Sequence, residues 1–139
     1  MNFKKIIFEK KNKISKITLN RPDQGNTLNL DLAKELFKAV NDVSADNESR
    51  ALILTGNGKL FCGGGDLKYL LSTDDKVKQV LLEMTHYFHG AISRIQSMNA
   101  PCIVAINGTA GGGGFSLAIT GDIIYSVKHA KFTLAYTNA

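Results

Sequence analysis

Asn107-Gly-Thr-Ala-Gly-Gly-Gly-Gly-Phe-Ser116 contains four consecutive glycines and lies between an apolar run at 102–106 and a segment at 115–120 that favours a helix. Backbone amides at a helix start have no intrahelical partners, and glycines let a ligand approach them closely because no Cβ atoms intervene. The helix start adds a partial positive charge. We therefore predict a site for a negative oxygen, which belongs either to a phosphate or to a carbonyl that becomes an oxyanion during a reaction.

The composition indicates an ordinary soluble protein. The chain has 139 residues with 44% hydrophobic side chains, which predicts a single domain over residues 1–139. Lys and Arg number 17 against 12 Asp and Glu, but the first twenty residues hold six Lys and one Glu. The charge of the remaining chain is balanced. We expect no nucleic-acid partner, because such partners usually need a basic stripe.

The two cysteines, Cys62 and Cys102, lie in glycine-rich or apolar surroundings and form no metal-binding motif. This use of cysteine predicts a reduced protein of the cytoplasm rather than a secreted one. The N-terminal apolar run at 6–8 is too short for the core of a signal peptide, and no later segment has the length and composition of a membrane span. We therefore expect a cytoplasmic protein with no membrane partner.

Hydrophobic periodicity predicts an α/β fold. Helices are expected where apolar residues recur every three or four positions, and strands where they form short alternating or continuous runs. The expected strands are 3–8 and 14–19, which form a hairpin with a turn around Asn12, then 51–54, 102–106, 122–127 and the extended piece 131–134. The expected helices run from Asn29 or Asp31 to Ala45, from the N-cap Asp66 to Leu71, from 76 to 98, and over 115–120.

A unit of strand, glycine turn and helix occurs twice, at 51–71 and at 102–120. Such a repeat predicts a stacked arrangement in which both glycine turns lie at the carboxyl edge of one parallel sheet, where ligands of such folds bind. Two backbone amides, one from each turn, would then converge on one oxygen atom.

The spacing of the motifs disfavours three other kinds of site. The segment 56–59 lacks the spacing and the Ser or Thr of a Walker loop, and no strand precedes a complete dinucleotide-binding Gly-x-Gly-x-x-Gly. The segment 114–118 resembles a hydrolase nucleophile elbow, but Ser116 would lie inside a helical turn. His86 and His89 lie three residues apart without a further ligand, so we predict no metal site.

Four motifs follow one another along the chain: Arg-Pro at 21–22 with Asn-Thr-Leu-Asn at 26–29, Phe-Cys-Gly-Gly-Gly-Asp-Leu at 61–67, Ala-Ile-Asn-Gly-Thr-Ala-Gly-Gly-Gly-Gly at 105–114, and Asp-Ile-Ile at 122–124. Together they resemble the crotonase superfamily, the enoyl-CoA hydratases and isomerases. The resemblance implies a crotonase-like spiral of ββα turns that, in this chain, stops before the C-terminal helical region of full-length relatives.

The resemblance also implies a site. The backbone amides of Gly65 and Gly113 would polarise the thioester carbonyl of an acyl-CoA. Coenzyme A would be part of the substrate, so no separate cofactor is expected. The residues implied to bind the substrate, with Lys68 placed for a phosphate, are Gln24, Thr27, Gly63, Asp66, Leu67 and Lys68.

Ser116 and Tyr136 occupy the positions of the two glutamates that hydratases of this family carry. Neither side chain supplies a carboxylate base. The segment 130–137 is similar to a branch that includes ring-epoxyphenylacetyl-CoA isomerases, so the resemblance implies isomerase-like chemistry if the chain is active. The alternative is a catalytically inert member that binds CoA esters or assembles with a partner chain.

Self-association is expected from the apolar surfaces. In full-length relatives, further spiral turns and C-terminal helices cover the core and build a trimer. The helix at 76–98 and the strand at 123–127 should therefore expose apolar side chains, and such patches drive the formation of a homo-oligomer.

Overall fold

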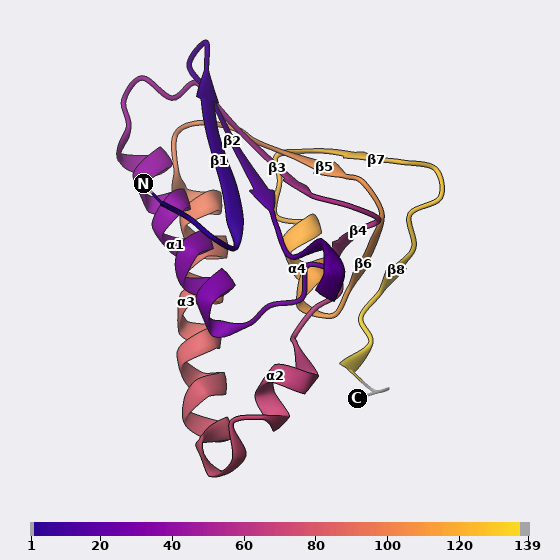
Figure 1. Ribbon diagram of the computed structural model, residues 1–139. Helices are drawn as coiled ribbons and strands as arrows, with labels where there is room; N and C mark the ends of the chain where they lie inside the picture. The colour runs from indigo at the N-terminus through magenta and orange to yellow at the C-terminus, as the bar shows by residue number, and fades with distance from the viewer. Residues whose placement is uncertain (1, 137–139) are drawn as a thin grey trace.

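The computed structural model describes residues 2–136 and shows a mixed α/β chain (Figure 1). The strands are β1 (Ile6–Lys11), β2 (Ile14–Leu19), β3 (Ala51–Gly56), β4 (Leu60–Cys62), β5 (Cys102–Ile106), β6 (Thr109–Gly111), β7 (Ile123–Ser126) and β8 (Phe132–Thr133). The helices are α1 (Leu30–Ala45), α2 (Leu67–Leu71), α3 (Val77–Ser97) and α4 (Gly113–Ala118), with 3₁₀ turns at Pro22–Gln24 and Asp74–Lys76. Every expected element is present, with boundaries shifted by at most three residues.

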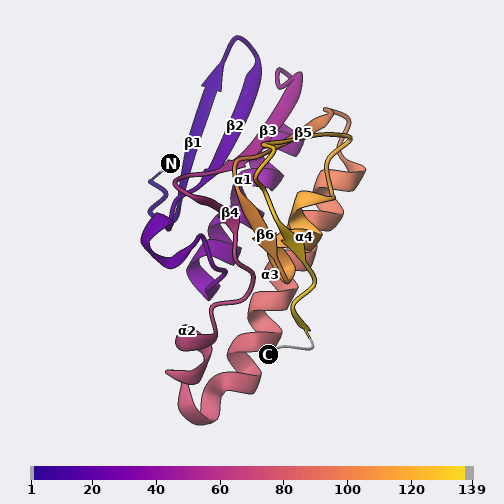
Figure 2. The ribbon, with the colours of Figure 1, turned by 90° about the vertical axis from the view of Figure 1, so that its right-hand side faces the viewer.

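The strands form two separate sheets (Figure 2). The larger sheet has the order β1-β2-β3-β5-β7, and the smaller one has the order β4-β6-β8. Only β1 and β2 pair antiparallel; the other neighbours among the described strands are parallel. Each turn from β3 onward gives one strand to each sheet, and the turns β3-β4-α2 and β5-β6-α4 end in a helix. This is the expected spiral of ββα turns.

The N-terminal hairpin is confirmed, although β1 begins three residues later than expected. Asn12 and Lys13 both have positive φ, 51° and 64°, and such a turn matches the right-handed twist of the flanking strands. The amides of Lys4 and Lys5 donate to the carboxylate of Glu35 in α1, the shortest contact being 2.7 Å. Both amides are therefore bonded to α1 rather than to β2.

Helices α1 and α3 pack against each other, and α1 contacts the larger sheet at β1 and β2 (Figure 1). Of the two expected caps, Asn29 starts α1, because its side chain accepts from the Leu32 amide at 2.9 Å. The predicted apolar faces bury Leu32, Leu36, Val40 and Val43 of α1 and Met84, Phe88 and Ile95 of α3. Within residues 2–136, no helix combines the length and the apolar composition that a membrane span needs.

Two short strands, β4 and β6, lie next to the predicted glycine turns and pair with each other in parallel. Three residues are too few to show a period in the sequence, so neither strand was expected. As a result, the glycines at 63–65 and 112–114 follow the carboxyl ends of β4 and β6. The two turns do share one sheet edge, but it belongs to the smaller sheet rather than to the sheet of β3 and β5.

Helix α4 begins at Gly113, two residues earlier than expected. Gly112 has a φ of 51° and its carbonyl accepts from the amides of Phe115 and Ser116 at 3.0 and 3.3 Å. This left-handed residue turns the chain from β6 directly into the helix, a conformation that glycine adopts easily.

The apolar side chains of β7 are exposed, as expected. Tyr125 is 67% exposed, and Leu82 on α3 is 62% exposed. β7 is an edge of the larger sheet, so its outer side carries no neighbouring strand among the described residues. Edges and apolar patches of this kind are sites of association.

Candidate functional site

A cavity of about 180 Å³ lies between the two glycine turns and helix α3. Gly65 and Gly113, the residues expected to supply the two amides, both line it. The other lining residues are Leu28, Ala33, Leu81, Met84, Thr85, Phe88, His89 and Tyr136. Most of them are apolar, so the cavity suits a hydrocarbon group beside a small number of polar contacts.

The Gly65 amide is held by hydrogen bonds on either side of it. The Leu28 amide donates to the Gly64 carbonyl at 2.7 Å, and the Asp66 amide donates to the Leu28 carbonyl at 2.9 Å. Gly64 has a φ of 95°, and a Cβ there would lie 2.8 Å from the carbonyl oxygen of Gly111. Among residues 2–136, no acceptor is found for the Gly65 amide. It can therefore donate to a ligand.

The Gly113 amide lies in the first turn of α4, where amides have no intrahelical acceptor. The preceding residue, Gly112, is fixed because its amide donates to the Thr133 carbonyl at 2.9 Å. A Cβ on Gly114 would lie 2.1 Å from the carbonyl oxygen of Cys62, so α4 starts in direct contact with β4. The described part of the chain offers no acceptor to the Gly113 amide either.

The two turns touch each other. A Cβ on Gly64 would lie 3.4 Å from the nitrogen of Gly113. Gly65 is exposed and Gly113 is half-buried, so solvent reaches the turns. Two donors on adjacent turns that line one apolar cavity can together bind a single carbonyl oxygen.

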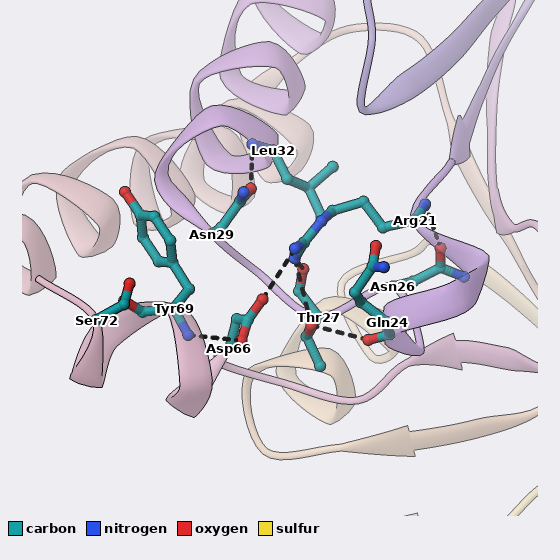
Figure 3. Close-up of polar contacts among 9 residues, drawn as sticks. All are labelled: Arg21, Gln24, Asn26, Thr27, Asn29, Leu32, Asp66, Tyr69 and Ser72. Carbon is teal, nitrogen blue, oxygen red and sulfur yellow. Dashed lines mark hydrogen bonds and ion pairs between the residues drawn. The ribbon is translucent and has the colours of Figure 1, made fainter.

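An ion pair between Arg21 and Asp66 joins the loop before α1 to the Gly65 turn (Figure 3). The Arg21 Nη2 atom lies 2.9 Å from the Asp66 Oδ2 atom, and Nη1 donates to the carbonyl and hydroxyl oxygens of Thr27. The other Asp66 oxygen accepts from the Tyr69 amide at 3.0 Å, which confirms Asp66 as the cap of α2. Burial alone would raise the pKa of Asp66, but the Tyr69 amide, Arg21 and Thr27 together hold it below its ordinary value.

Asn26 fixes the same loop from its other side (Figure 3). Its buried side chain donates to the carbonyls of Asn57 and Leu60, both at 2.9 Å, and accepts from the Arg21 amide at 2.8 Å. Arg21 and Asn26 belong to the motifs quoted above, but the sequence did not show what they do. The structure shows that they position the loop against β4 and the Gly65 turn.

Three of the residues expected to bind CoA are neighbours. The Thr27 hydroxyl and amide both donate to the Gln24 carbonyl, at 2.8 and 3.1 Å. A Cβ on Gly63 would lie 3.1 Å from the Thr27 Cγ2 atom. Leu67 and Lys68 begin α2, just after the Gly65 turn, and both are exposed.

The two residues expected at the positions of the family glutamates lie in different surroundings. Tyr136 lines the cavity, whereas Ser116 lies inside α4 and is not one of the lining residues. Ser116 therefore sits within a helical turn, as expected, and not at the apex of a strand-to-helix elbow.

His89 also lines the cavity. In the sequence, the only role considered for this residue was that of a metal ligand. The sequence feature that could have indicated this position is that His89 directly follows Phe88, which belongs to the predicted apolar stripe.

The two free cysteines do not provide a nucleophile. Burial raises the pKa of the Cys62 thiol to about 11. Burial, together with the charge of Asp122, raises the pKa of Cys102 to about 12. Both thiols are therefore protonated at neutral pH, and only thiolates are reactive.

The fold has counterparts among known proteins. The family model for enoyl-CoA hydratase/isomerase matches residues 9–139. The chain belongs to the enoyl-CoA hydratase/isomerase family. Its motifs at 21–29, 61–67, 105–114 and 122–124 all lie inside the matched region.

This family member is 32% identical over 122 residues to the 1,2-epoxyphenylacetyl-CoA isomerase of Escherichia coli strain K12, a match that covers 87% of this chain and 47% of that protein. It is 33% identical over 135 residues to the short-chain-enoyl-CoA hydratase of Clostridium acetobutylicum, covering 95% and 50%. The crystal structure of enoyl-CoA hydratase from Bacillus halodurans matches with a TM-score of 0.85 at 26% identity, over 93% of this chain and 52% of that one. The chain thus has the crotonase fold and spans about half the length of the relatives it matches.

Proposed function

We propose that the chain binds an acyl-CoA thioester, with the acyl group in the cavity and the carbonyl oxygen between the amides of Gly65 and Gly113. One observation carries this proposal: two backbone donors that have no acceptor among the described residues line the same apolar cavity. Membership of the enoyl-CoA hydratase/isomerase family supports a CoA thioester as the ligand.

The CoA part is proposed to lie along the adjoining residues Gln24, Thr27 and Gly63 and the start of α2, at Leu67 and Lys68. This edge leads directly to the Gly65 turn, so a ligand bound along it would bring its thioester to the cavity. The ammonium group of Lys68 is exposed and would face a phosphate, which is a favourable charge-assisted contact. Coenzyme A enters as part of the substrate, so no separate cofactor is proposed.

The proposed chemistry is isomerase-like. Two fixed donors at the carbonyl oxygen stabilise an enolate, so a proton can leave the neighbouring carbon and return elsewhere. The similarity to an epoxyphenylacetyl-CoA isomerase supports isomerisation. Hydration is disfavoured because Ser116 and Tyr136 stand where hydratases carry glutamates, and we expect crotonyl-CoA to be hydrated slowly.

A second candidate is an inert member that only binds CoA esters or joins a partner chain. The observation that favours it is the lining of the cavity, which contains no carboxylate among the described residues. Both candidates predict acyl-CoA binding, and they differ in whether a bound acyl group loses a proton.

The binding proposal is tested by changing the ligand. Butyryl-CoA should show its carbonyl stretch at lower frequency when bound, as seen by isotope-edited infrared spectroscopy. The thioether S-butyl-CoA lacks the carbonyl oxygen and should bind about thirtyfold more weakly, since the two neutral hydrogen bonds that it loses contribute about 1 kcal/mol each. This design avoids a proline at Gly113, which would disfavour the φ of 51° at Gly112. Equal affinities and an unshifted stretch would contradict the proposal.

We also propose that the chain self-associates and works in the cytoplasm. Exposed apolar side chains on β7 and α3, including Tyr125 and Leu82, support self-association. Two buried free cysteines support a reducing compartment.

A further inference from the structure

One face of α3 forms a wall of the cavity. The residues of α3 that line the cavity are Leu81, Met84, Thr85, Phe88 and His89. They recur at intervals of three and four positions, so they share one face of the helix. His89 is the last residue of this stripe and the only imidazole among the described lining residues.

The His89 end of this stripe lies beside the second glycine turn. A Cβ on Gly113 would lie 3.5 Å from the Phe88 Cε1 atom and 3.2 Å from the Leu28 Cδ1 atom. Phe88 immediately precedes His89, so this level of α3 adjoins the Gly113 amide. A thioester carbonyl bound to that amide would place its neighbouring carbons close to His89.

We propose that His89 is the catalytic base that removes a proton from the bound acyl group. This rests on the proposed acyl-CoA site and names the group that supplies its proton transfer. The position of each reacting group follows from the cavity: the oxygen lies at the two amides, the carbon chain lies along the apolar stripe, and the imidazole stands at the end of that stripe.

The other polar side chains of the cavity are poorer bases. A tyrosine phenol in its neutral form carries its own proton and has no strongly basic lone pair. The Thr85 hydroxyl donates to the Leu82 carbonyl at 3.0 Å, and a hydroxyl does not accept a carbon-bound proton at neutral pH. A neutral imidazole has a free lone pair on one nitrogen, which can accept a proton.

The proton balance is complete without a further reactant. The neutral imidazole of His89 takes a proton from the carbon next to the thioester carbonyl. The electron pair of that C–H bond moves to the carbonyl oxygen, which becomes an enolate oxygen held by the amides of Gly65 and Gly113. The imidazolium then returns the proton, either to the same carbon or, in a 3-enoyl chain, to the far end of the conjugated system. The second course moves the double bond into conjugation.

Because solvent reaches His89, removal of the acyl proton can be measured by deuterium exchange. His89 is exposed to solvent. In deuterated water, a proton held by the imidazole exchanges before it returns, so the acyl carbon gains deuterium. Saturated butyryl-CoA reports proton removal alone, and 3-butenoyl-CoA reports the double-bond shift.

His86 is the matched control on the same helix. It is also an exposed histidine, but its ring lies 6.4 Å from the Phe37 ring of α1 and 5.3 Å from the Tyr87 ring. It is not one of the residues that line the cavity. His86→Gln therefore removes an imidazole from α3 without touching the proposed site.

The experiment measures deuterium uptake into butyryl-CoA by mass spectrometry, together with its binding by calorimetry, for the full chain and three variants. His89→Gln should lower exchange by about 10²–10⁴-fold, the usual contribution of a general base, while binding stays within about twofold. His86→Gln should exchange at the parent rate. His89→Ala should regain exchange on addition of free imidazole, a rescue that a merely structural role would not produce.

The outcomes separate the two proposals. Exchange that is unchanged in His89→Gln, or a parent chain that binds butyryl-CoA without any exchange, overturns the role of His89 and leaves the binding site standing. A parent chain that does not bind butyryl-CoA overturns the proposed function itself. Loss of exchange in both histidine variants alike also counts against His89, because it would mark a general effect on α3.

Discussion

Replacing Asp66 by asparagine tests whether the Arg21–Asp66 ion pair holds the Gly65 turn. Asparagine keeps the oxygen that caps α2, but it removes the charge and places an N–H donor where Arg21 needs an acceptor. The paired atoms lie 2.9 Å apart and the side chains are only 10% and 13% exposed, so water screens the pair weakly. Removal of one partner of a buried pair costs about 3–5 kcal/mol, because the other charge stays buried. We expect about 3 kcal/mol, the low end, since Arg21 keeps the oxygens of Thr27 as acceptors.

A double-mutant cycle isolates the pair. Urea denaturation of Asp66→Asn, Arg21→Met and the double variant should give a coupling free energy of at least about 1.5 kcal/mol, as for other hydrogen bonds between charged groups. The control is the pair Lys38–Asp42 on α1, with nearly the same N–O distance of 3.0 Å but side chains 59% and 34% exposed. Its coupling should be only about 0.3–0.5 kcal/mol.

The same variants report on the site. The amides of Leu28 and Asp66 form the hydrogen bonds on either side of Gly65, so they should exchange faster with deuterium when the ion pair is lost. Butyryl-CoA should bind more weakly for the same reason. A coupling no larger than that of the control pair, or unchanged exchange at Leu28, would refute the idea that this ion pair holds the turn.

Five further outcomes are expected. The pKa of Asp66 is lowered in the folded chain, so its ionised carboxylate stabilises the fold above the unfolded pKa of about 3.9. This stabilisation is lost as the pH falls through the lower folded pKa. In urea titrations, the difference in unfolding free energy between the parent and Asp66→Asn should therefore shrink below about pH 4. Gly114→Ala should destabilise by about 3 kcal/mol or more, because its Cβ would lie 2.1 Å from a carbonyl oxygen of β4. Gly65→Ala, whose Cβ meets no atom within 4 Å, should stay within about 0.5 kcal/mol in the same assay. Asn29→Ala removes the cap of α1 and should lower the unfolding free energy by about 1 kcal/mol. Light scattering should show an oligomer at micromolar concentration, and a stable monomer would contradict self-association.

Local patterns in the sequence were sufficient to predict the helices and strands whose apolar residues form a clear pattern. The apolar residues of α1 recur at helical spacing, and its cap, Asn29, has a side chain that accepts a backbone hydrogen bond, so both its face and its start could be predicted. β5 was predicted at 102–106 because a proline before it and glycines after it bound a continuous apolar run.

Contacts between distant segments could not be predicted in the same way. β4 and β6 are strands only because they pair with each other, and each is three residues long. Arg21 and Asp66 are 45 residues apart, so nothing local marks them as partners. For His89, helical spacing places Phe88 on an inward face, but it does not say that a cavity opens at that level of α3. That fact depends on where the glycine turns lie.

The pairing of β4 with β6 explains why two donors meet at one cavity. Parallel neighbours have their carboxyl ends side by side, and each of these strands continues into a glycine turn that leads to a helix. Gly65 immediately precedes the cap of α2, and Gly113 begins α4, so each repeat supplies an amide near its helix start. The turns approach so closely that a Cβ on Gly64 would collide with the backbone. The donors are thus a product of stacking the repeated unit. In the proposed function they would act on any thioester that reaches them, so the side chains around the cavity would distinguish one reaction from another. Among the described lining residues, the proposal assigns the proton transfer to His89.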